Sequence, residues 1–313
     1  MTIAAIDSLS WNLVSDFNQM WAYAFMRNAF EAGTVVSIVG GVVGYFVVLR
    51  RTAFAAHALS HVGFAGGAGA ALLVVDPLWG LLAFCVGAAA VMGAIGQRLR
   101  ERDVVIGIVL MFALGLGYLF INLYSGNSAD VYSILFGQIF GIDTEDVVVT
   151  LVVGVIVVTL IGVIYRPLLF ASVDPEVAEA RRVPVRVLAI AFMTIVGLAV
   201  AVSVQVVGVL LIFALLIAPA AIAERLCSRP SSAMVVSVVT ALACTWIGLL
   251  LGFYFSPPVS FFITSLATGG YVLARVVSYA LGRARAVPAV AGDPGSRWPT
   301  RSLSPDPAGT IQL

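Results

Sequence analysis

Long apolar runs dominate this sequence of 313 residues and limit what it can fold into. Most of them are about 20 residues long, and a helix of that length, at about 1.5 Å per residue, crosses a hydrocarbon core of about 30 Å. We therefore predict an all-α, polytopic membrane protein with about nine transmembrane helices. The predicted spans lie near residues 30–49, 54–75, 78–97, 104–123, 147–165, 187–204, 206–223, 233–255 and 259–280.

The composition supports a membrane-embedded chain and excludes one class of enzyme. The chain is 61% hydrophobic and 11% charged, with a mean hydropathy of +1.07, whereas soluble domains are about half apolar or less. All 17 basic residues are arginine. A Walker A phosphate loop needs a lysine to reach the β and γ phosphates, so the chain has no ATPase motif of its own and is not predicted to be an enzyme. Cys85, Cys227 and Cys244 form no CxxC pair and are predicted to be small buried hydrophobes.

The arginines mark every second connection between the predicted spans. Arg-rich connections lie at residues 50–51, 98–102, 166–186 and 225–229, and the connections between them contain no arginine. Because Arg-rich loops stay in the cytoplasm, this pattern predicts an outer N-terminus and a cytoplasmic C-terminus, with Arg27 as the one arginine outside. We expect a multi-pass protein of the bacterial cell (inner) membrane. The outer face is acidic, which would concentrate cations there, although the lack of arginine alone explains much of this charge.

The only two histidines of the chain, His57 and His61, lie four residues apart in the second predicted span. That spacing places both imidazoles on one helical face, about 40° apart around the axis and about 6 Å along it, so one metal ion could contact both. Ionisable groups at membrane depth are rare and often mark a transport path. The alternative is that both are polar side chains hydrogen-bonded to neighbouring helices. Gly63, Gly66 and Gly67 follow, and we expect another helix to pack closely against them.

Two shorter stretches between the spans also carry structural signals. Residues 129–141 are apolar but too short to cross, and we predict a re-entrant or surface-packed segment on the outer side. Asp174 followed by Pro175 and Glu176 is typical of a helix start, with Asp as the N-cap and Pro in the first turn. We expect a short amphipathic surface helix there, and a tight outer turn at Gly208.

Four separated stretches, in this order and spacing, point to one family. They read VVLRRTAFAAHALSHVGFAG (47–66), YSILFGQIFG (132–141), VDPEVAEARRVPVR (173–186) and VSVQVVGVLLIFALLIAPAAIAERL (202–226). Over about residues 28–280 the chain resembles the membrane permeases of zinc and manganese ABC importers. On this basis we divide the chain into an outer amphipathic N-terminal segment (1–28), a transmembrane permease domain (29–281) and a disordered cytoplasmic tail (282–313).

The resemblance implies a function and its partners. Two copies of the permease would pair around a central path, a separate ABC ATPase would dock on the cytoplasmic side, and an extracytoplasmic metal-binding protein would deliver the cargo. The family usually carries an Asp four residues before the second-span histidine, as in GDALSH, and His57 replaces it here. A dimer would then offer four imidazoles. Because imidazole suits zinc whereas oxygen ligands suit manganese, we expect zinc as the most favoured divalent cargo, with manganese as a second option and no permanently bound cofactor.

The same resemblance suggests how the permease couples to its ATPase. Pro219 should kink its span, after which Ala220 begins a stretch resembling the family's short coupling helix. Glu224, Arg225 and Arg229 would be interface charges, the alternative being an ordinary cluster at the membrane border. The remaining arginines follow span borders and form no basic groove, so we expect contact with the lipid bilayer and none with nucleic acid.

Three other functions compete with this interpretation. An intramembrane metalloprotease would use HExxH, but Ala58 stands where its glutamate is needed and residues 52–75 contain no acid. An ABC permease for a metal chelate such as a siderophore or cobalamin would gain nothing from a histidine pair. A secondary metal transporter or channel would work without an ATPase. The predicted orientation places His57 near the cytoplasmic side, which favours an inner gate or exit site over a receiving site.

Overall fold

The described part of the chain is entirely helical. The computed structural model describes residues 21–95, 102–124, 137, 139–255 and 257–285, and within these ranges it contains helices and no strand. In chain order they are α2 (Ala24–Leu49), α3 (Ala53–Leu72), α4 (Pro77–Ile95), α5 (Arg102–Leu123), the 3₁₀ helix η1 (Ile139–Gly141), α7 (Thr144–Val173), α8 (Pro175–Ala180), α9 (Val185–Val207), α10 (Val209–Leu226), α11 (Pro230–Tyr254) and α12 (Val259–Arg285).

Each predicted span corresponds to one long helix, in the predicted order. Within the described ranges, seven helices are long and apolar enough to cross a membrane, namely α2, α4, α5, α7, α9, α11 and α12. The predicted all-α membrane fold is therefore confirmed. The two long helices outside this set are α3, which carries the histidines and glycines, and α10. Nine membrane crossings and the orientation of the termini stay predictions.

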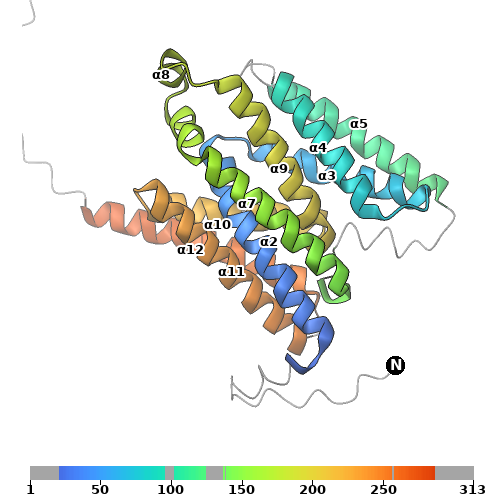
Figure 1. The fold of residues 1–313 in the computed structure, drawn as a ribbon. Coiled ribbons are helices and arrows are strands. Elements are labelled where there is room, and N and C mark those ends of the chain that lie inside the picture. Colours follow the sequence, from blue (N-terminus) through green and yellow to red (C-terminus); the bar gives the residue numbers. More distant parts are fainter. Residues whose placement is uncertain (1–20, 96–101, 125–136, 138, 256, 286–313) are drawn as a thin grey trace, which may run out of the picture.

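The helices form two groups joined by α9 (Figure 1). One group contains α3, α4 and α5, with α3 packed against both of the others. The second group surrounds α2, which contacts α7, α10 and α11, while α12 packs on α10 and α11. Helix α9 contacts α4, α3, α2 and α7. The most buried helices are thus α2, α3 and α9, and the apolar outer faces of α5, α7 and α12 remain exposed.

Small side chains and buried hydroxyls hold α2 against α11. A Cβ at Gly41 would lie 2.6 Å from Val238 Cα, so only glycine permits this approach. The hydroxyl of Ser237 donates to Gly41 O at 2.9 Å, and the hydroxyls of Ser37 and Thr245 bond at 2.7 Å. Hydrogen bonds of this kind specify which helix faces meet when both faces are equally apolar.

Local signals in the sequence set several helix ends. Asp174 Oδ1 accepts a hydrogen bond from Val177 N at 3.0 Å, with Pro175 in the first turn of α8, so the predicted surface helix and its cap are confirmed. Gly208 alone separates α9 from α10 and has φ +84°, a backbone conformation that residues with a Cβ rarely adopt. The predicted tight turn is therefore present.

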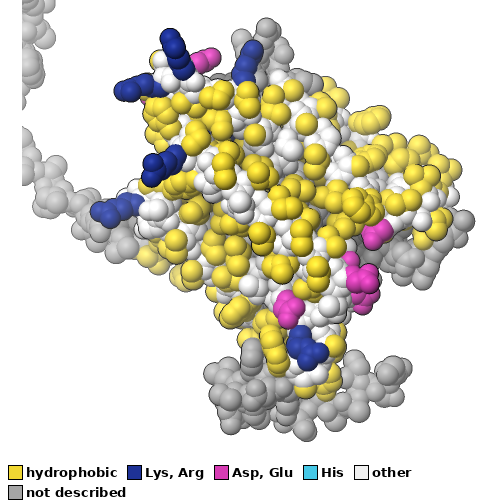
Figure 2. Space-filling model, in the orientation of Figure 1, with side chains coloured by type: hydrophobic (Ala, Val, Ile, Leu, Met, Phe, Trp, Pro, Cys, Tyr) yellow, Lys and Arg dark blue, Asp and Glu magenta, His cyan; other side chains and the backbone are white. Residues whose placement is uncertain are grey.

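Charge divides between the two ends of the molecule. In Figure 2 most of the visible arginine side chains lie at the upper left, where α8 and α12 end in Figure 1, and most of the acidic side chains lie toward the lower right, where one arginine is also visible. The Arg-rich and the Arg-free connections thus lie at opposite ends of the molecule. We name these ends after their connections, the Arg-rich end and the Arg-free end.

Three predicted segments lie partly or wholly outside the described residues. Of the N-terminal segment 1–28, residues 1–20 are not described, and α2 already begins at Ala24. Of the segment 129–141, only residue 137 and η1 are described; Ile139 is buried, and a Cβ at Gly137 would collide with the backbone of Val207. Helix α12 continues to Arg285 and so includes the first four residues of the predicted tail 282–313, and the remainder of that tail lies outside the described residues.

Candidate functional site

The two histidines lie together on α3, close to the Arg-rich end. The centroids of the His57 and His61 rings are 4.8 Å apart, and the ring planes meet at 89°. Both residues are half-buried, and the Nδ1 atom of each is buried without a hydrogen-bond partner. A buried polar atom with no partner is costly. The Nδ1 atoms therefore do not support the alternative that neighbouring helices form hydrogen bonds with both histidines.

Neighbouring groups confine the His57 ring without offering it a polar atom. Phe213 of α10 lies with its ring centroid 4.7 Å from that of His57. Ser60 lies between the two histidines along the chain, but its hydroxyl donates to His57 O at 2.7 Å and so satisfies the backbone of its own helix. The pair thus has an aromatic wall on the α10 side, and its nitrogens are the available ligands.

One chain supplies two donors at this position. The described residues contain no group of three or more His, Cys, Asp or Glu side chains able to hold a metal ion. Cys85 of α4 packs against α3. Its thiol is fully buried and donates a hydrogen bond to Leu59 O at 3.4 Å. It belongs to the α3–α4 contact, as expected of a small buried hydrophobe.

The glycines that follow the histidines lie inside the chain's own helix packing. A Cβ at Gly63 would lie 2.8 Å from Cys85 Sγ, and a Cβ at Gly66 would collide with the backbone of Gly80 on α4. Gly67 is also buried. Helix α3 is therefore held firmly by α4 on its glycine side, and this anchoring positions the histidines one to two turns away.

Residues at the Arg-free end form a polar contact that the sequence did not reveal. Gln205 of α9 donates from Nε2 to Asp146 Oδ1 of α7 at 2.8 Å, and Gln205 Oε1 is buried without a partner. Asp143 and Glu145 lie beside Asp146 at the start of α7. An acid in the first turn of one span and a glutamine in the last turn of another were visible in the sequence, but nothing there indicated that the two helices are neighbours.

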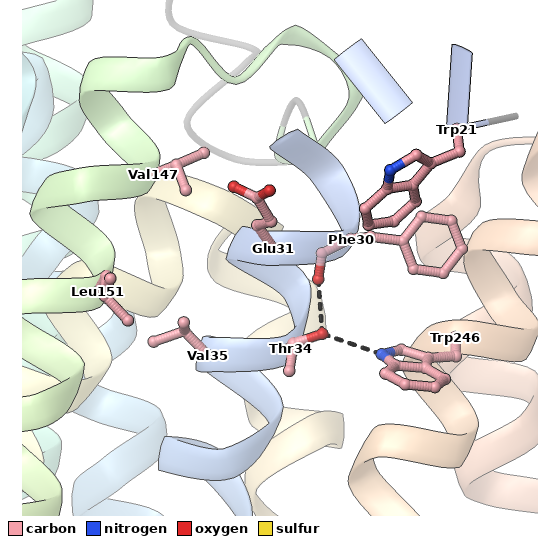
Figure 3. Close-up of a pocket in the computed structure, with 8 residues that line it drawn as sticks. All are labelled: Trp21, Phe30, Glu31, Thr34, Val35, Val147, Leu151 and Trp246. Atoms are coloured by element: carbon pink, nitrogen blue, oxygen red, sulfur yellow. Dashed lines mark hydrogen bonds between the residues drawn. The ribbon is translucent and has the colours of Figure 1, made fainter. Parts of the chain in front are cut away.

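A cavity of about 420 Å³ opens between α2, α7 and α11 near the Arg-free end. In Figure 3 the Thr34 hydroxyl donates to Phe30 O (2.6 Å) and accepts from Trp246 Nε1 (3.0 Å). Glu31 contributes the one carboxylate, and the other lining residues are apolar: Trp21, Val35, Val147 and Leu151. The cavity borders the first turns of α2, whereas α3 begins beyond the last turn of α2. It is therefore far from the histidines and lacks the donors of a metal site.

The predicted ATPase-coupling residues divide into a buried and an exposed set. Helix α10 continues through Pro219 to Leu226, so residues 220–226 are its last turns and form no separate short helix, unlike the expectation from the sequence. Pro219 and Ala220 are buried and cannot contact another chain directly. Glu224, Arg225 and Arg229 are exposed at the Arg-rich end.

Comparisons with known proteins agree with this architecture. The family model described as "ABC 3 transport family" matches residues 22–278. The manganese transport system membrane protein MntC of Halalkalibacterium halodurans is 33% identical over 248 residues, covering 78% of this chain and 83% of that protein. The manganese import system permease protein ScaB of Streptococcus parasanguinis is 32% identical, covering 74% of this chain and 82% of that protein.

Two solved structures share the fold. The structure of PsaBC from Streptococcus pneumoniae in complex with Fab superposes with a TM-score of 0.75 at 29% identity, covering 83% of this chain and 94% of that one. An inward-facing putative metal-chelate type ABC transporter superposes with a TM-score of 0.66 at 14% identity, covering 88% of this chain and 91% of that one. At that identity the second likeness concerns the fold alone.

Proposed function

This chain belongs to the ABC 3 transport family, and on that premise we propose that it forms the membrane path of an ATP-driven importer of a divalent transition metal. It is a permease subunit of a metal ABC transporter and a multi-pass protein of the bacterial inner membrane. A permease subunit is not itself an enzyme, so ATP hydrolysis belongs to a partner chain.

The observation that carries the proposal is the histidine pair of α3. The two imidazole rings lie edge to face with their centroids 4.8 Å apart, and each has a buried Nδ1 atom that has no hydrogen-bond partner. Neutral imidazole is the commonest protein ligand for transition metals. A site that provides ligand atoms but leaves them without other partners suits a cargo that binds and then leaves.

A second copy of the chain would complete the site. Transition metals in closed protein sites take four or more ligands, and one chain supplies two here. We propose that two copies bring their α3 helices to a shared axis, so that four imidazoles surround the metal. Moving the copies apart then breaks the ligand sphere and releases the metal. His57 lies one turn after the start of α3, which supports an inner gate or exit site near the Arg-rich end.

The cargo is either manganese or zinc, and a different observation favours each metal. The names of the relatives MntC and ScaB refer to manganese, which makes manganese the better supported cargo. The expectation of zinc from the sequence finds no support in those names. Zinc remains the second candidate because His57 and His61 supply nitrogen ligands and no carboxylate of the described residues joins them. Such a donor set suits zinc better than manganese.

We propose that the ATPase docks on the Arg-rich end and the metal-binding protein on the Arg-free end. Glu224, Arg225 and Arg229 are exposed around the α10–α11 connection and can meet a partner's charges. The capped helix α8 projects from the same end with Glu179 exposed, and it offers a second rigid contact.

Transport by the reconstituted complex tests this function against the alternatives. The chain would be placed in liposomes with or without its ATPase partner, and uptake of Mn²⁺ and Zn²⁺ measured with and without ATP. We expect uptake of a bare divalent metal that requires both ATPase and ATP. Metal flux from the chain alone would instead indicate a secondary transporter or channel, and uptake of a siderophore or cobalamin but not of bare metal would indicate a chelate permease.

A further inference from the structure

The outer face of α12 near the Arg-rich end combines two arginines with an apolar surface. A cavity of about 440 Å³ is lined there by Arg225 from α10 and by Val272, Arg275, Val276, Ser278 and Tyr279 from α12. It is separate from the histidine pair and from the cavity of Figure 3. We propose that this cavity binds an anionic phospholipid, with the lipid phosphate on the two arginines and an acyl chain along the valines.

The geometry of Arg225 brings its charge to α12. Its Nη2 atom donates to Tyr271 Oη at 3.2 Å, and its guanidinium carbon lies 5.3 Å from the centre of the Tyr271 ring. Tyr271 and Arg275 are one turn apart on α12, so they lie on the same face. Tyr271 thus holds the charge of Arg225 next to that of Arg275.

Charge complementarity identifies the head group. Helix α12 (Val259–Arg285) contains no acidic residue, and no carboxylate is among the described residues that line the cavity. Among the described residues, neither Arg225 nor Arg275 is paired with a carboxylate, although Glu224 precedes Arg225 in the chain. Two guanidinium groups without acidic partners, beside the Ser278 hydroxyl, form a donor set that suits phosphate oxygens.

The apolar part of the cavity argues for a lipid over a free phosphate ion. Val272 and Val276 lie one turn apart and are 54% and 58% exposed, on a face of α12 that none of the described helices covers. Arg275 lies 16 residues after the start of α12 at Val259, which is about 24 Å along the helix axis. In a hydrocarbon core of about 30 Å, this places the Arg275 backbone just inside the boundary on the Arg-rich side, from where a long arginine side chain reaches the head groups. Basic pockets between helices on the cytoplasmic side bind anionic head groups.

Native mass spectrometry of the purified full-length chain tests the site. The protein in mild detergent would be incubated with equal amounts of phosphatidylglycerol and phosphatidylcholine that carry the same acyl chains. We expect the wild-type chain to retain phosphatidylglycerol preferentially, and Arg225→Gln together with Arg275→Gln to reduce that preference at least about tenfold. Arg166→Gln is the matched control, because Arg166 is an exposed arginine of α7 at the same end that does not line the cavity.

Two further measurements distinguish the lipid from other ligands. Val276→Trp leaves both arginines in place but fills the apolar part of the cavity, so it should also reduce phosphatidylglycerol retention. In the second measurement, inorganic phosphate added to the wild-type chain should not displace the lipid. A wild-type chain without preference for phosphatidylglycerol, or an arginine double variant that retains it as well as Arg166→Gln does, would overturn the proposal. So would displacement of the lipid by inorganic phosphate. Neither metal nor ATP enters the assay, so its outcome is independent of the transport function.

Discussion

Gly66 of α3 and Gly80 of α4 lie against each other so closely that a Cβ added to either one would collide with the backbone carbonyl of the other. Phe84 of α4 closes the same contact, with its Cβ 2.7 Å from a Cβ built at Gly66. Backbone atoms cannot move aside as the end of a flexible side chain can. This contact therefore sets how far apart α3 and α4 lie, and with it the position of the histidines on α3.

We predict that Gly66→Ala destabilises the protein by about 1–3 kcal/mol, because the new methyl group forces two packed helices apart. The loss should exceed the gain of up to about 1 kcal/mol that alanine normally gives over glycine inside a helix. Gly87→Ala on α4 is the matched control, since a Cβ there meets nothing within 4 Å. Thermal unfolding in detergent should show a lower midpoint for Gly66→Ala and an equal or higher one for Gly87→Ala. Equal midpoints for the two variants would contradict the close contact.

The histidine pair gives the second prediction. His61→Ala removes one of the two ligand groups of each chain, and we expect ATP-driven metal uptake to fall at least about tenfold. Loss of a residue that only supports a metal ligand already lowers metal affinity or activity by about 10- to 100-fold. His57→Asp replaces an imidazole with a carboxylate, which suits manganese. This variant should keep transport and raise the ratio of Mn²⁺ to Zn²⁺ uptake. Competition uptake with both metals in liposomes containing the full complex measures this ratio.

Ser60→Ala is the control for the histidine variants. Ser60 lies between the histidines and is buried, and its hydroxyl donates a hydrogen bond to His57 O. Removing it should leave uptake and metal preference near the wild-type values. Zinc uptake at the wild-type rate in a protein carrying both His57→Asp and His61→Ala would rule out the histidine pair as part of the path.

Much of the fold was predictable because each span carries its own signal. Hydrophobic length gave the long helices, and Asp174 with Pro175 gave the start of α8, since these properties depend only on neighbours in the chain. The end of α10 was predicted less well. Pro219 suggested a kink followed by a short coupling helix from Ala220, but α10 continues as one helix to Leu226. Packing against α12 buries Ile222 and Ala223 and stabilises these last turns.

The candidate site was predictable in its residues but not in its surroundings. A spacing of four indicated that His57 and His61 share a face, and their rings do lie side by side. The sequence could not indicate that Phe213 covers His57, or that Gln205 meets Asp146, because these pairs join helices far apart in the chain. Apolar helix faces resemble one another, so periodicity says which residues face inward but not which helix they meet.

The contact between Asp146 and Gln205 gives the third prediction. Their hydrogen bond joins α7 to α9 at 2.8 Å, and Gln205 already has a buried Oε1 atom without a partner. Asp146→Ala leaves Gln205 Nε2 unpaired as well, and we expect a loss of about 1–3 kcal/mol of stability. Asp146→Asn keeps an acceptor oxygen at that position and should lose less. Glu145→Ala, at an exposed neighbour, should unfold at the wild-type midpoint. A loss with Glu145→Ala equal to that with Asp146→Ala would point to general charge at this end and not to the hydrogen bond.

The last prediction concerns the ATPase. Arg229 is exposed in the connection between α10 and α11 and does not line the proposed lipid cavity, so its charge is available to a partner. We expect Arg229→Glu to weaken co-purification of the ATPase about tenfold, because reversing a charge at an interface turns attraction into repulsion. Arg166→Glu makes the same charge change on α7 at the same end and should leave the amount of bound ATPase unchanged. Glu179→Arg on α8 completes the set. If Arg229→Glu and Arg166→Glu bind the ATPase equally well while Glu179→Arg loses it, then the ATPase docks on α8 and not on the α10–α11 connection.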